Sequence, residues 1–478
     1  MVKLVRVLNR MNMLINTKKK PLVVALSLAL LSASQLGYAS EGGTGVADEV
    51  YTGSQVVVMP YVMEGDEITK RIDDARFFDS SGLVLGNDAS SRKNFFYDSS
   101  VQVINGTLAL SEQDIFNKSS VQYIYKGMSA YGLFGENSKQ IATGADVYSV
   151  GAKFNDDARQ EISNKAYSSE SSFHGRASQA IGPGGLSLDD AFTESATQLM
   201  NSGDTNAPAL SMNSKFSGNS GQLVGLNSSS GNAQFTDNAK QIVTGTGSVS
   251  YGSTFTGAST QTIQDGGSSN NATFSDNASQ MLEDGAQSEN TTFNDNSSGM
   301  VGANAQMSGN TTLNGNAVLT AIAAYQAHAE ARQIDNIAIN QNARLNILGA
   351  NNSDSANEVT AGTITMNGGT IQFGHESGSD HYSTLLADTV TGSGGNLIMN
   401  GNLGTHHNDV LSTGTMSGRY AITLNNQDSG REIAGDGDLH GLIQIDEDKG
   451  SVFTLTTINP DTGKPTPNNP DNHGTDQG

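Results

Sequence analysis

The stretch "FSDNASQMLEDG", from Phe274 to Gly285, recurs in altered form along much of this chain. Two earlier versions read "FTGASTQTIQDG" from Phe255 and "FTDNAKQIVTG" from Phe235. Each version begins with Phe, carries Gln six residues later and ends in Gly. A fixed phrase that returns about every twenty residues is typical of a repeat architecture, which decides the fold before any other feature.

The Phe and Gln positions define two columns that run through the repeats. The pairs that keep the spacing are Phe96 and Gln102, Phe116 and Gln122, Phe134 and Gln140, Phe154 and Gln160, Phe173 and Gln179, Phe192 and Gln198, Phe216 and Gln222, Phe235 and Gln241, Phe255 and Gln261, and Phe274 and Gln280. At the ends of the series, Phe77 leads to Leu83, Phe293 leads to Gly299, and Leu313 stands where a thirteenth Phe would fall. Twelve of the 16 Phe residues lie on this column, so the repeat is not a chance pattern.

The length of the repeat predicts a β-solenoid. A unit of about twenty residues is too short for two packed helices, which need roughly 33 residues in the helical repeat families. The units are rich in Asn, Asp, Gly, Ser and Thr, with short β-like stretches between turn clusters. Since one unit cannot bury its own apolar face, we expect parallel coils to stack Phe on Phe. Thirteen coils spaced by about 4.8 Å would make a rod of about 60 Å.

The Gln column admits two structural interpretations and one functional interpretation. Stacked amides could form a hydrogen-bonded ladder from coil to coil, or the column could simply be polar and face outward. Alternatively, the column could bind a ligand.

The N-terminus has the pattern of a secretory signal peptide over residues 1–39. Its first twenty residues carry six positive charges and no acid, and the apolar run "PLVVALSLALLSASQLG" follows. Small residues precede a cleavage point after Ala39. Met11 or Met13 could be the true start. The apolar run is short and interrupted by Ser and Gln, which disfavours a membrane anchor.

Charge and cysteine content restrict the class of protein. The net charge is −22 and the signal contributes +6, which leaves −28 for the remainder. Such acidity argues against nucleic acid or an anionic membrane as a direct partner. The chain contains no Cys, so disulfides cannot stabilise it after export, and the stacked coils must do so.

The repeats are followed by a region of different character. "NAVLTAIAAYQAHAEARQ", Asn316 to Gln333, is rich in Ala and could form a short helix or an irregular coil. Strand-like phrases resume at Ile334, and the last twenty residues read as a disordered linker. The predicted organisation is a signal peptide (1–39), an N-terminal cap segment (40–76), the repeat solenoid (77–320), a C-terminal β-helix region (321–458) and a disordered linker or tail (459–478).

The C-terminal region carries a motif that resembles a known family. Within Leu385–Gln427, Gly392 and Gly394 form a G-x-G turn, Asp409 and Leu411 form an Asp-x-Leu strand, and Gly418 precedes the next strand. This segment is similar to the C-terminal passenger region of pertactin. Together with the long signal and the repeats, it makes the chain resemble an autotransporter passenger domain of the AIDA-type adhesin group.

The resemblance implies a right-handed parallel β-helix that is exported and displayed on the cell surface, where it adheres to host cells or to like cells. Members of the family end in a translocator barrel, whereas this sequence stops at Gly478 inside the apparent linker. We therefore expect either a truncated gene product or an outer-membrane barrel supplied in trans. Without a barrel, the protein would remain in the periplasm or be secreted.

Candidate catalytic and metal-binding residues are few. "HESGSDH", from His375 to His381, has the wrong spacing for a zinc helix and contains helix-breaking Gly378, so a solvated turn is favoured. His406 and His407 could join Asp409 in a metal site, but adjacent residues of a strand point to opposite faces. "DSG", Asp428 to Gly430, lacks the preceding Gly of the serine-protease passenger motif. We predict no catalytic, cofactor-binding or metal-binding residue and no cofactor.

Acidic residues recur two positions after the Phe column. They are Asp79, Asp98, Glu136, Asp156, Glu194, Asp237, Asp276 and Asp295. Asx turns before the apolar strand are the favoured interpretation, with weak cation binding as the alternative. Sequons occur at Asn271 and Asn290, and a chain this rich in Asn and Ser needs no glycan to explain them.

These patterns predict a non-enzymatic adhesin or self-associating surface rod. Its partners would be host-cell or bacterial surface components or another copy of the chain. One alternative is a remnant without a barrel and without a surface function. Another is a β-helix enzyme acting on polysaccharide, which the scarcity of Lys and Arg in the repeats disfavours.

Overall fold

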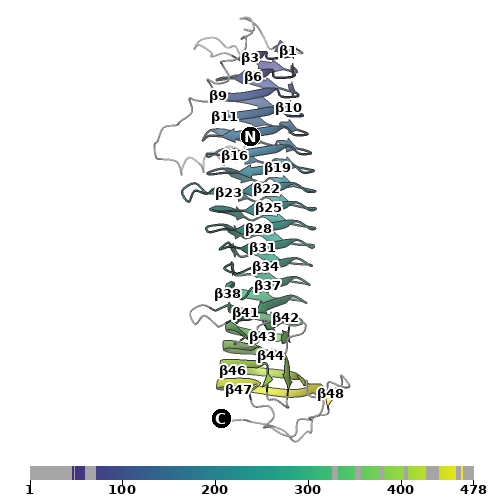
Figure 1. The fold of residues 1–478 in the computed structure, drawn as a ribbon, viewed down its shortest axis with the longest axis vertical. Helices are drawn as coiled ribbons and strands as arrows, with labels where there is room; N and C mark the ends of the chain where they lie inside the picture. The colour runs from purple at the N-terminus through teal and green to yellow at the C-terminus, as the bar shows by residue number, and fades with distance from the viewer. Residues whose placement is uncertain are drawn as a thin grey trace.

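The structure is a computed structural model that describes residues 46–47, 49–59, 71–325, 332–349, 357–375, 382–402, 407–426, 441–458 and 465–466. These residues form a rod of stacked coils that runs from the purple N-terminal end to the yellow C-terminal end (Figure 1). Every regular element among them is a β-strand, and all strands belong to one hydrogen-bonded system. The prediction of an all-β right-handed parallel β-helix with one coil per repeat is confirmed.

Each coil of the repeat region contributes strands to three faces. The Phe face is made of β2 (Val50–Tyr51), β5 (Arg76–Phe77), β8 (Phe95–Phe96), β10 (Ile115–Phe116), β12 (Leu133–Phe134), β15 (Lys153–Phe154), β18 (Ser172–Phe173), β21 (Ala191–Phe192), β24 (Lys215–Phe216), β27 (Gln234–Phe235), β30 (Thr254–Phe255), β33 (Thr273–Phe274) and β36 (Thr292–Phe293). The Gln face is made of β3 (Val56–Met59), β6 (Gly82–Leu85), β13 (Lys139–Thr143), β16 (Arg159–Ser163), β19 (Ser178–Ile181), β22 (Thr197–Met200), β25 (Gly221–Val224), β28 (Lys240–Thr244), β31 (Thr260–Gln264), β34 (Ser279–Leu282), β37 (Ser298–Val301), β39 (Val318–Ile322) and β42 (Arg344–Gly349).

The third face, named the Ser face, has a buried Ser at the middle of most strands. It is made of β1 (Val46–Ala47), β4 (Arg71–Asp73), β7 (Ser90–Arg92), β14 (Val147–Val150), β17 (Tyr167–Ser169), β20 (Leu186–Leu188), β23 (Ala209–Met212), β26 (Ser228–Gly231), β29 (Val249–Tyr251), β32 (Ser268–Asn270) and β35 (Gln287–Glu289). Two longer strands, β9 (Val101–Glu112) and β11 (Val121–Ala130), continue from the Gln face onto the Ser face, and β38 (Gln306–Leu313) joins the Ser and Phe faces.

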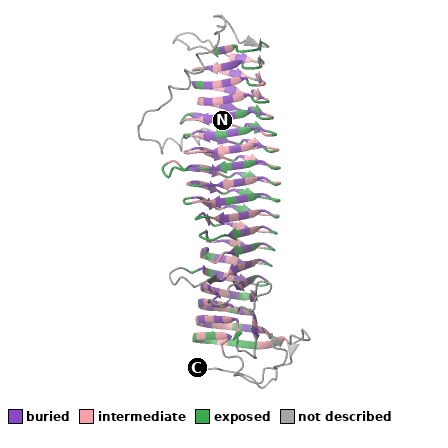
Figure 2. Cartoon of the chain, viewed as in Figure 1, coloured by how far each residue is buried: buried purple, intermediate pink, exposed green. Residues whose placement is uncertain are grey.

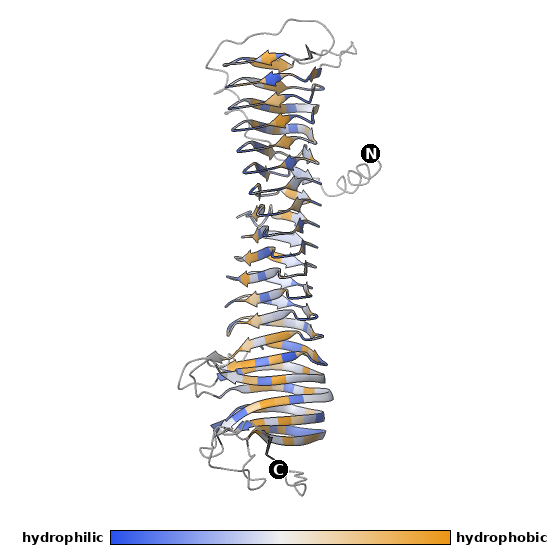
Figure 3. Cartoon of the chain, turned by 90° about the vertical axis from the view of Figure 1, so that its right-hand side faces the viewer, coloured by the Kyte–Doolittle hydropathy of each residue, from blue (hydrophilic) through white to orange (hydrophobic). Residues whose placement is uncertain are grey.

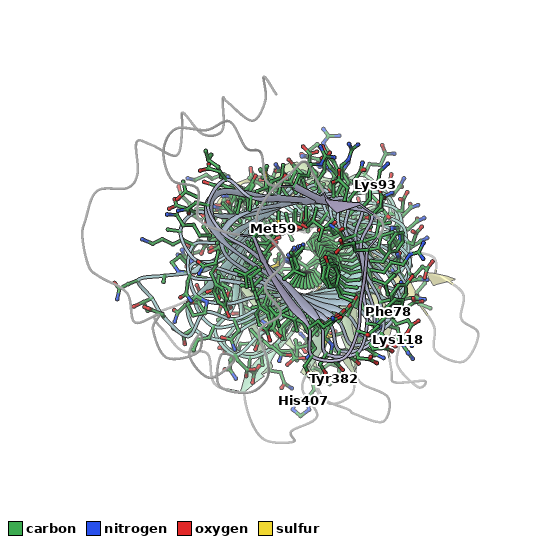
Figure 4. All side chains as sticks on the ribbon, turned by 90° about the horizontal axis from the view of Figure 1, so that it is seen from above. Met59, Phe78, Lys93, Lys118, Tyr382 and His407 are labelled. Carbon is green, nitrogen blue, oxygen red and sulfur yellow. The ribbon has the colours of Figure 1, made fainter. Side chains whose placement is uncertain are left out.

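The predicted Phe column is the apolar centre of the rod. Its rings stack from Tyr51 and Phe77 through to Phe293, with centroids 4.6–5.1 Å apart and planes inclined by 4–17°. Leu313 continues the column by pairing in register with Phe293, as its spacing predicted. Each Phe is 0–1% exposed, so each contributes about 1.5–3 kcal/mol through burial. The view along the rod shows the side chains of successive coils superimposed, both inside and outside the ribbon (Figure 4).

Two left-handed corners flank each Phe strand and allow the chain to turn twice within a few residues. The first corner lies three residues before Phe and includes Lys93 and Asn232; the second lies two residues after Phe and includes Asp98 and Gly218. All four residues have φ between 52° and 69°. Gly, Asn and Asp tolerate this conformation best, which explains why turn residues recur at fixed offsets.

The Ala-rich segment continues the solenoid. Val318–Ile322 form β39 and Ala324–Tyr325 form β40, so the helical alternative is wrong for this part. Leu319 lies inside the rod and pairs with Gly299 of the previous coil. Stacking onto an existing coil therefore outweighs the helix propensity of alanine.

The C-terminal coils use longer strands. They comprise β41 (Ile334–Asn340), β43 (Asn357–His375), β44 (Thr384–Asn402), β46 (Val410–Asn426) and β47 (Ile443–Ile458), which pair in parallel from coil to coil. Short strands β45 (His407–Asn408) and β48 (Pro465–Thr466) add antiparallel pairings, and β40 pairs antiparallel with β43. Gly394 has φ of +106°, and a Cβ there would overlap the carbonyl of Arg419 in the next coil. The G-x-G motif thus lets neighbouring coils approach closely.

The predicted signal peptide lies outside the described residues. The predicted linker also lies outside them, except for β48, which pairs with Thr457 and Ile458. The boundaries predicted for the five segments stay predictions. Tyr51 already stacks on Phe77, so the ring column reaches one coil further toward the N-terminus than the Phe repeat.

Removing one ring from the column should destabilise the rod. We expect Phe173→Ala to lower the free energy of unfolding by about 3–5 kcal/mol, because it leaves a cavity between Phe154 and Phe192. Phe173→Leu should cost less, since Leu313 already serves in this column. Guanidinium unfolding followed by circular dichroism measures both, with the outward-facing Ser172→Ala as the control. If Phe173→Ala lowered the free energy of unfolding no more than Ser172→Ala, that result would contradict a stabilising role of the ring column.

Candidate functional site

The Gln column lies inside the rod and forms the predicted ladder. The Nε2 of each Gln donates to the Oε1 of the Gln in the preceding coil, from Gln122 onto Gln102 through to Gln280 onto Gln261. These nine bonds measure 2.6–2.9 Å. All members are 0–3% exposed, so the outward and ligand-binding interpretations are wrong for this column.

The ladder also joins two faces of the solenoid across its interior. Gln122 Nε2 donates to Ser111 Oγ at 3.0 Å, and Gln280 Nε2 donates to Ser288 Oγ at 3.0 Å. A buried amide left without partners would cost about 1–3 kcal/mol, and Ser hydroxyls accept from the second N–H of several ladder amides, including Gln102, Gln160 and Gln198. The purple interior of the rod in Figure 2 thus contains a polar column beside the apolar one.

Two buried carboxylates interrupt this interior, and the sequence reasoning missed both. Asp114 Oδ1 accepts from the backbone N–H of Asn94 at 2.8 Å, and Asp190 Oδ1 accepts from the N–H of Ser171 at 2.8 Å. The second oxygen of each accepts from a ladder amide, Gln102 or Gln179, at 2.7 Å. Both residues stand two positions before Phe, where most coils have Ala, Ser or Gly, and that exception is the signal that could have revealed them.

Burial shifts the ionisation of these two groups. It raises the pKa of the Asp190 carboxyl from 3.8 to about 6, although hydrogen bonds from Ser171, Gln179 and Ser187 oppose part of the rise. Burial likewise raises the pKa of Asp114, again against hydrogen-bond donors that favour the charged form. Both carboxyls are 0% exposed and join neighbouring coils, so we interpret them as structural groups.

The acidic column after Phe occupies the second left-handed corner. Its carboxylates accept from backbone N–H groups of the preceding coil: Gly218 N donates to Asp237 Oδ2 and Gly257 N to Asp276 Oδ2, both at 3.0 Å. The Asx-turn prediction is therefore wrong about the partner, because an Asx turn bonds within its own coil. Since these acids cap adjacent coils, they need no bound cation to explain them.

The sequons have a structural explanation as well. Asn271 and Asn290 stand at the first left-handed corner, with φ of 56° and 53°. Asn is among the few residues that adopt this conformation readily, so it recurs there for steric reasons.

The histidine candidates do not converge. His407 is exposed at the periphery of the rod (Figure 4), whereas Asp409 is 0% exposed. The Asp409 carboxylate accepts from the backbone N–H groups of Ser383 at 2.9 Å and Asn400 at 2.7 Å, so it joins two coils. His406, residues 376–381 and the "DSG" at 428–430 lie outside the described residues. Within the described ranges, no three residues among His, Asp and Glu gather as metal ligands.

Residues that bind a partner must lie on the outer surface of the rod, and the polarity of this surface varies along its length. Outward positions in the C-terminal repeats hold Thr, Ser, Asn and Gln, such as Thr254, Thr273 and Thr292 on the Phe face. Earlier coils carry apolar groups on the outside, and the orange segments in Figure 3 mark apolar residues along the rod. Leu199 and Ile242 are 46% and 38% exposed on the Gln face. In the part of the chain that the structure describes, no helix has the length and apolarity that crossing a bilayer would require.

Comparison with known proteins supports the family resemblance. Residues 361–463 match the family model described as Pertactin, which covers the coils carrying Gly392, Gly394 and Asp409. This match confirms the resemblance of the C-terminal region to the passenger region of pertactin. Passengers of this kind are exported to the cell surface.

Among solved structures, the chain is similar to a hyper-glycosylated TibA fragment, residues 55–350, whose glycosylation TibC catalyses. The sequence identity is 14%, the match covers 68% of this chain and 98% of that one, and the TM-score is 0.48. A likeness this distant carries no functional information. No curated protein matches the sequence.

The buried carboxyl of Asp190 makes stability depend on pH. Its folded pKa lies above the unfolded value of 3.8, so the folded state holds the proton more tightly between about pH 4 and 6. Stability contributed by this group is therefore present at low pH and is lost as pH rises through about 6. Relative to wild type, we expect Asp190→Asn to gain about 2 kcal/mol in unfolding free energy between pH 4 and pH 7.

The measurement is guanidinium unfolding of both proteins across that pH range. Asp189→Asn is a matched control, because Asp189 is exposed one residue away and its left-handed φ of 55° suits Asn. A difference between wild type and Asp190→Asn that stays constant with pH would contradict the assignment.

Proposed function

We propose that this protein is an exported, non-enzymatic rod that adheres to surfaces through many weak contacts along its length. The observation that carries the proposal is the difference between the buried side chains, which join the coils, and the outward side chains, which repeat along the surface. The side chains of the Gln ladder, Asp114, Asp190 and Asp409 are buried and hydrogen-bond between coils, whereas outward residues such as Thr254, Thr273 and Thr292 repeat at coil spacing on the surface. The pertactin match supports placing this rod on the cell surface.

The mechanism rests on repetition. Equivalent outward residues of successive coils lie about 4.8 Å apart, so a partner surface meets the same group many times. Individually weak hydrogen bonds and apolar contacts then add through effective concentration, and avidity exceeds the affinity of any one contact. The partners we propose are components of host-cell or bacterial surfaces and other copies of this chain. Residues 1–39 would direct export as a signal peptide.

Deleting whole coils should weaken adhesion in steps. Removal of 255–273, 235–273 or 216–292 leaves a Phe behind each junction, so the ring column and the Gln ladder stay in register. We expect cell–cell aggregation and cell binding to fall progressively across the three deletions, because fewer repeated contacts remain. Aggregation of cells expressing each variant is measured by settling, after normalising to surface protein probed with antibody on intact cells.

The control is protease treatment of intact cells, which shows that each variant reaches the surface and stays folded. Aggregation and binding that are unchanged after removal of 216–292 would contradict a multivalent mechanism. Protein confined to the periplasm would contradict surface display.

A further inference from the structure

The outer side of the Gln face carries two adjacent thioethers. Met281 of β34 and Met300 of β37 stand one residue after the inward ladder position, so both side chains point outward. They are register partners in neighbouring coils, which places their backbones about 4.8 Å apart. Met281 is 42% exposed and Met300 is 38% exposed. Two sulfur-containing side chains are therefore open to solvent at one place on the rod.

The other methionines that the structure describes are less accessible. Met59, Met128 and Met212 are half-buried. The Sδ of Met212 already accepts a hydrogen bond from the Tyr251 hydroxyl at 2.8 Å. Five more are only 0–1% exposed, namely Met200, Met307, Met366, Met399 and Met416. Among the described residues, the exposed pair thus has the greatest solvent access of any thioether.

The composition of the chain makes this pair its most readily oxidised accessible group. The chain contains no Cys and no Trp, so it has neither thiol nor indole side chains. Methionine is then the side chain that a peroxide converts most readily, to methionine sulfoxide. The conversion turns a flexible apolar side chain into a polar one. A peroxide that reaches the rod should therefore act first at Met281 and Met300.

The position of the pair separates its oxidation from unfolding. The inward neighbours Gln280, Leu282 and Val301 are 0–2% exposed and provide the packing of these coils. A sulfoxide on the outer side would be hydrated and would leave that packing in place. Oxidation of Met307, which is buried, would instead put a polar oxygen into the core at a large cost in stability.

The pair also ends an apolar column of the outer surface. This column, named the outer Gln column, comprises Leu199, Leu223, Ile242, Thr262, Met281 and Met300, each in register with the next. One coil further on, Thr320 takes the same position. Since Thr262 and Thr320 lie on either side of the two methionines, conversion of both thioethers would leave the apolar part of the column at Leu199, Leu223 and Ile242 alone.

We propose that Met281 and Met300 form an oxidation site on the outer Gln face, where hydrogen peroxide converts both thioethers to sulfoxides while the rod stays folded. In each reaction the sulfur lone pair attacks one peroxide oxygen, so that an S–O bond forms and the O–O bond breaks. The sulfur loses two electrons and the peroxide gains them. The second oxygen leaves as water after it takes the proton of the transferred hydroxyl.

The site gives the rod a surface that responds to oxidants. The modification itself needs no partner, whereas its effect on adhesion rests on the proposed function. Contacts that a partner surface makes with the end of the outer Gln column lose apolar character when the sulfoxides form, so adhesion weakens. Enzymatic reduction of the sulfoxides should restore it, because this step of methionine oxidation is reversible.

The first test is treatment of the purified exported chain with hydrogen peroxide, followed by digestion and tandem mass spectrometry to locate each added oxygen. We expect Met281 and Met300 to react at least about tenfold faster than Met307 in the folded protein. Met307 is the matched control, because it is close in sequence and 1% exposed. In guanidinium the three should react at similar rates. Similar rates in the folded protein would overturn the site.

Circular dichroism and thermal melting of the oxidised protein test whether the rod stays folded. We expect the β-sheet signal and the melting temperature of protein oxidised only at Met281 and Met300 to match those of untreated protein. Loss of the β-sheet signal at that stage would show that the two side chains support the fold, which would overturn their assignment as a surface site.

Two double variants test the effect on adhesion. M281L/M300L keeps apolar side chains without sulfur, so cells expressing it should adhere like wild type and should resist peroxide. M281Q/M300Q places polar amides there and should lower adhesion roughly threefold to tenfold without any oxidant, as peroxide does for wild type. Thr262→Gln is the matched control, because it puts the same amide at a position of the column that is already polar.

Failure of this inference can be told apart from failure of the proposed function. If wild type and both double variants adhere equally before and after peroxide, the link between the site and adhesion is overturned, while the adhesive rod stands. If cells expressing the coil deletions adhere like wild type, the multivalent mechanism fails. The oxidation rates of Met281, Met300 and Met307 still decide the oxidation site in that case, because they need no partner.

Discussion

The register between successive coils is the constraint on which the rest of this structure depends. Parallel strands fix the spacing of coils near 4.8 Å, and the interior must then present groups that pair with themselves at that distance. Stacked rings such as Phe154 and Phe173 and the amides of the Gln ladder both do so. The ring column supplies apolar burial, while the ladder makes any slip of register leave buried amides unpaired.

The sequence predicted this core because its spacing is visible without a structure. Phe and Gln six residues apart place both side chains on the inside of one coil, and the Leu83, Gly299 and Leu313 variants fell in register as expected. Which side the Gln residues face did not follow from the pattern, because an isolated polar residue usually favours solvent. Only the presence of a matching Gln in each neighbouring coil makes burial favourable.

The candidate site was less accessible to sequence reasoning. Asp114 and Asp190 look like ordinary turn acids until the coil geometry places them inside, next to Ser and Gln donors. The outer columns are hidden for a related reason: Tyr148 and Leu186 lie 38 residues apart in the sequence, and only the stacking places them in one column, two coils apart. Once the Phe and Gln columns are aligned, the outward residues that share a face in successive coils can be identified from the sequence.

The most direct test of this structure is hydrogen exchange of the Gln side-chain amides in protein labelled with ¹⁵N at glutamine. The ladder predicts that the amides from Gln102 to Gln280 exchange far more slowly than those of Gln234 and Gln287, which are exposed on the same coils. Exchange of the ladder amides at the rate of these two controls would place the column in solvent. That result would contradict the interior ladder and, with it, the assignment of the outer faces to binding.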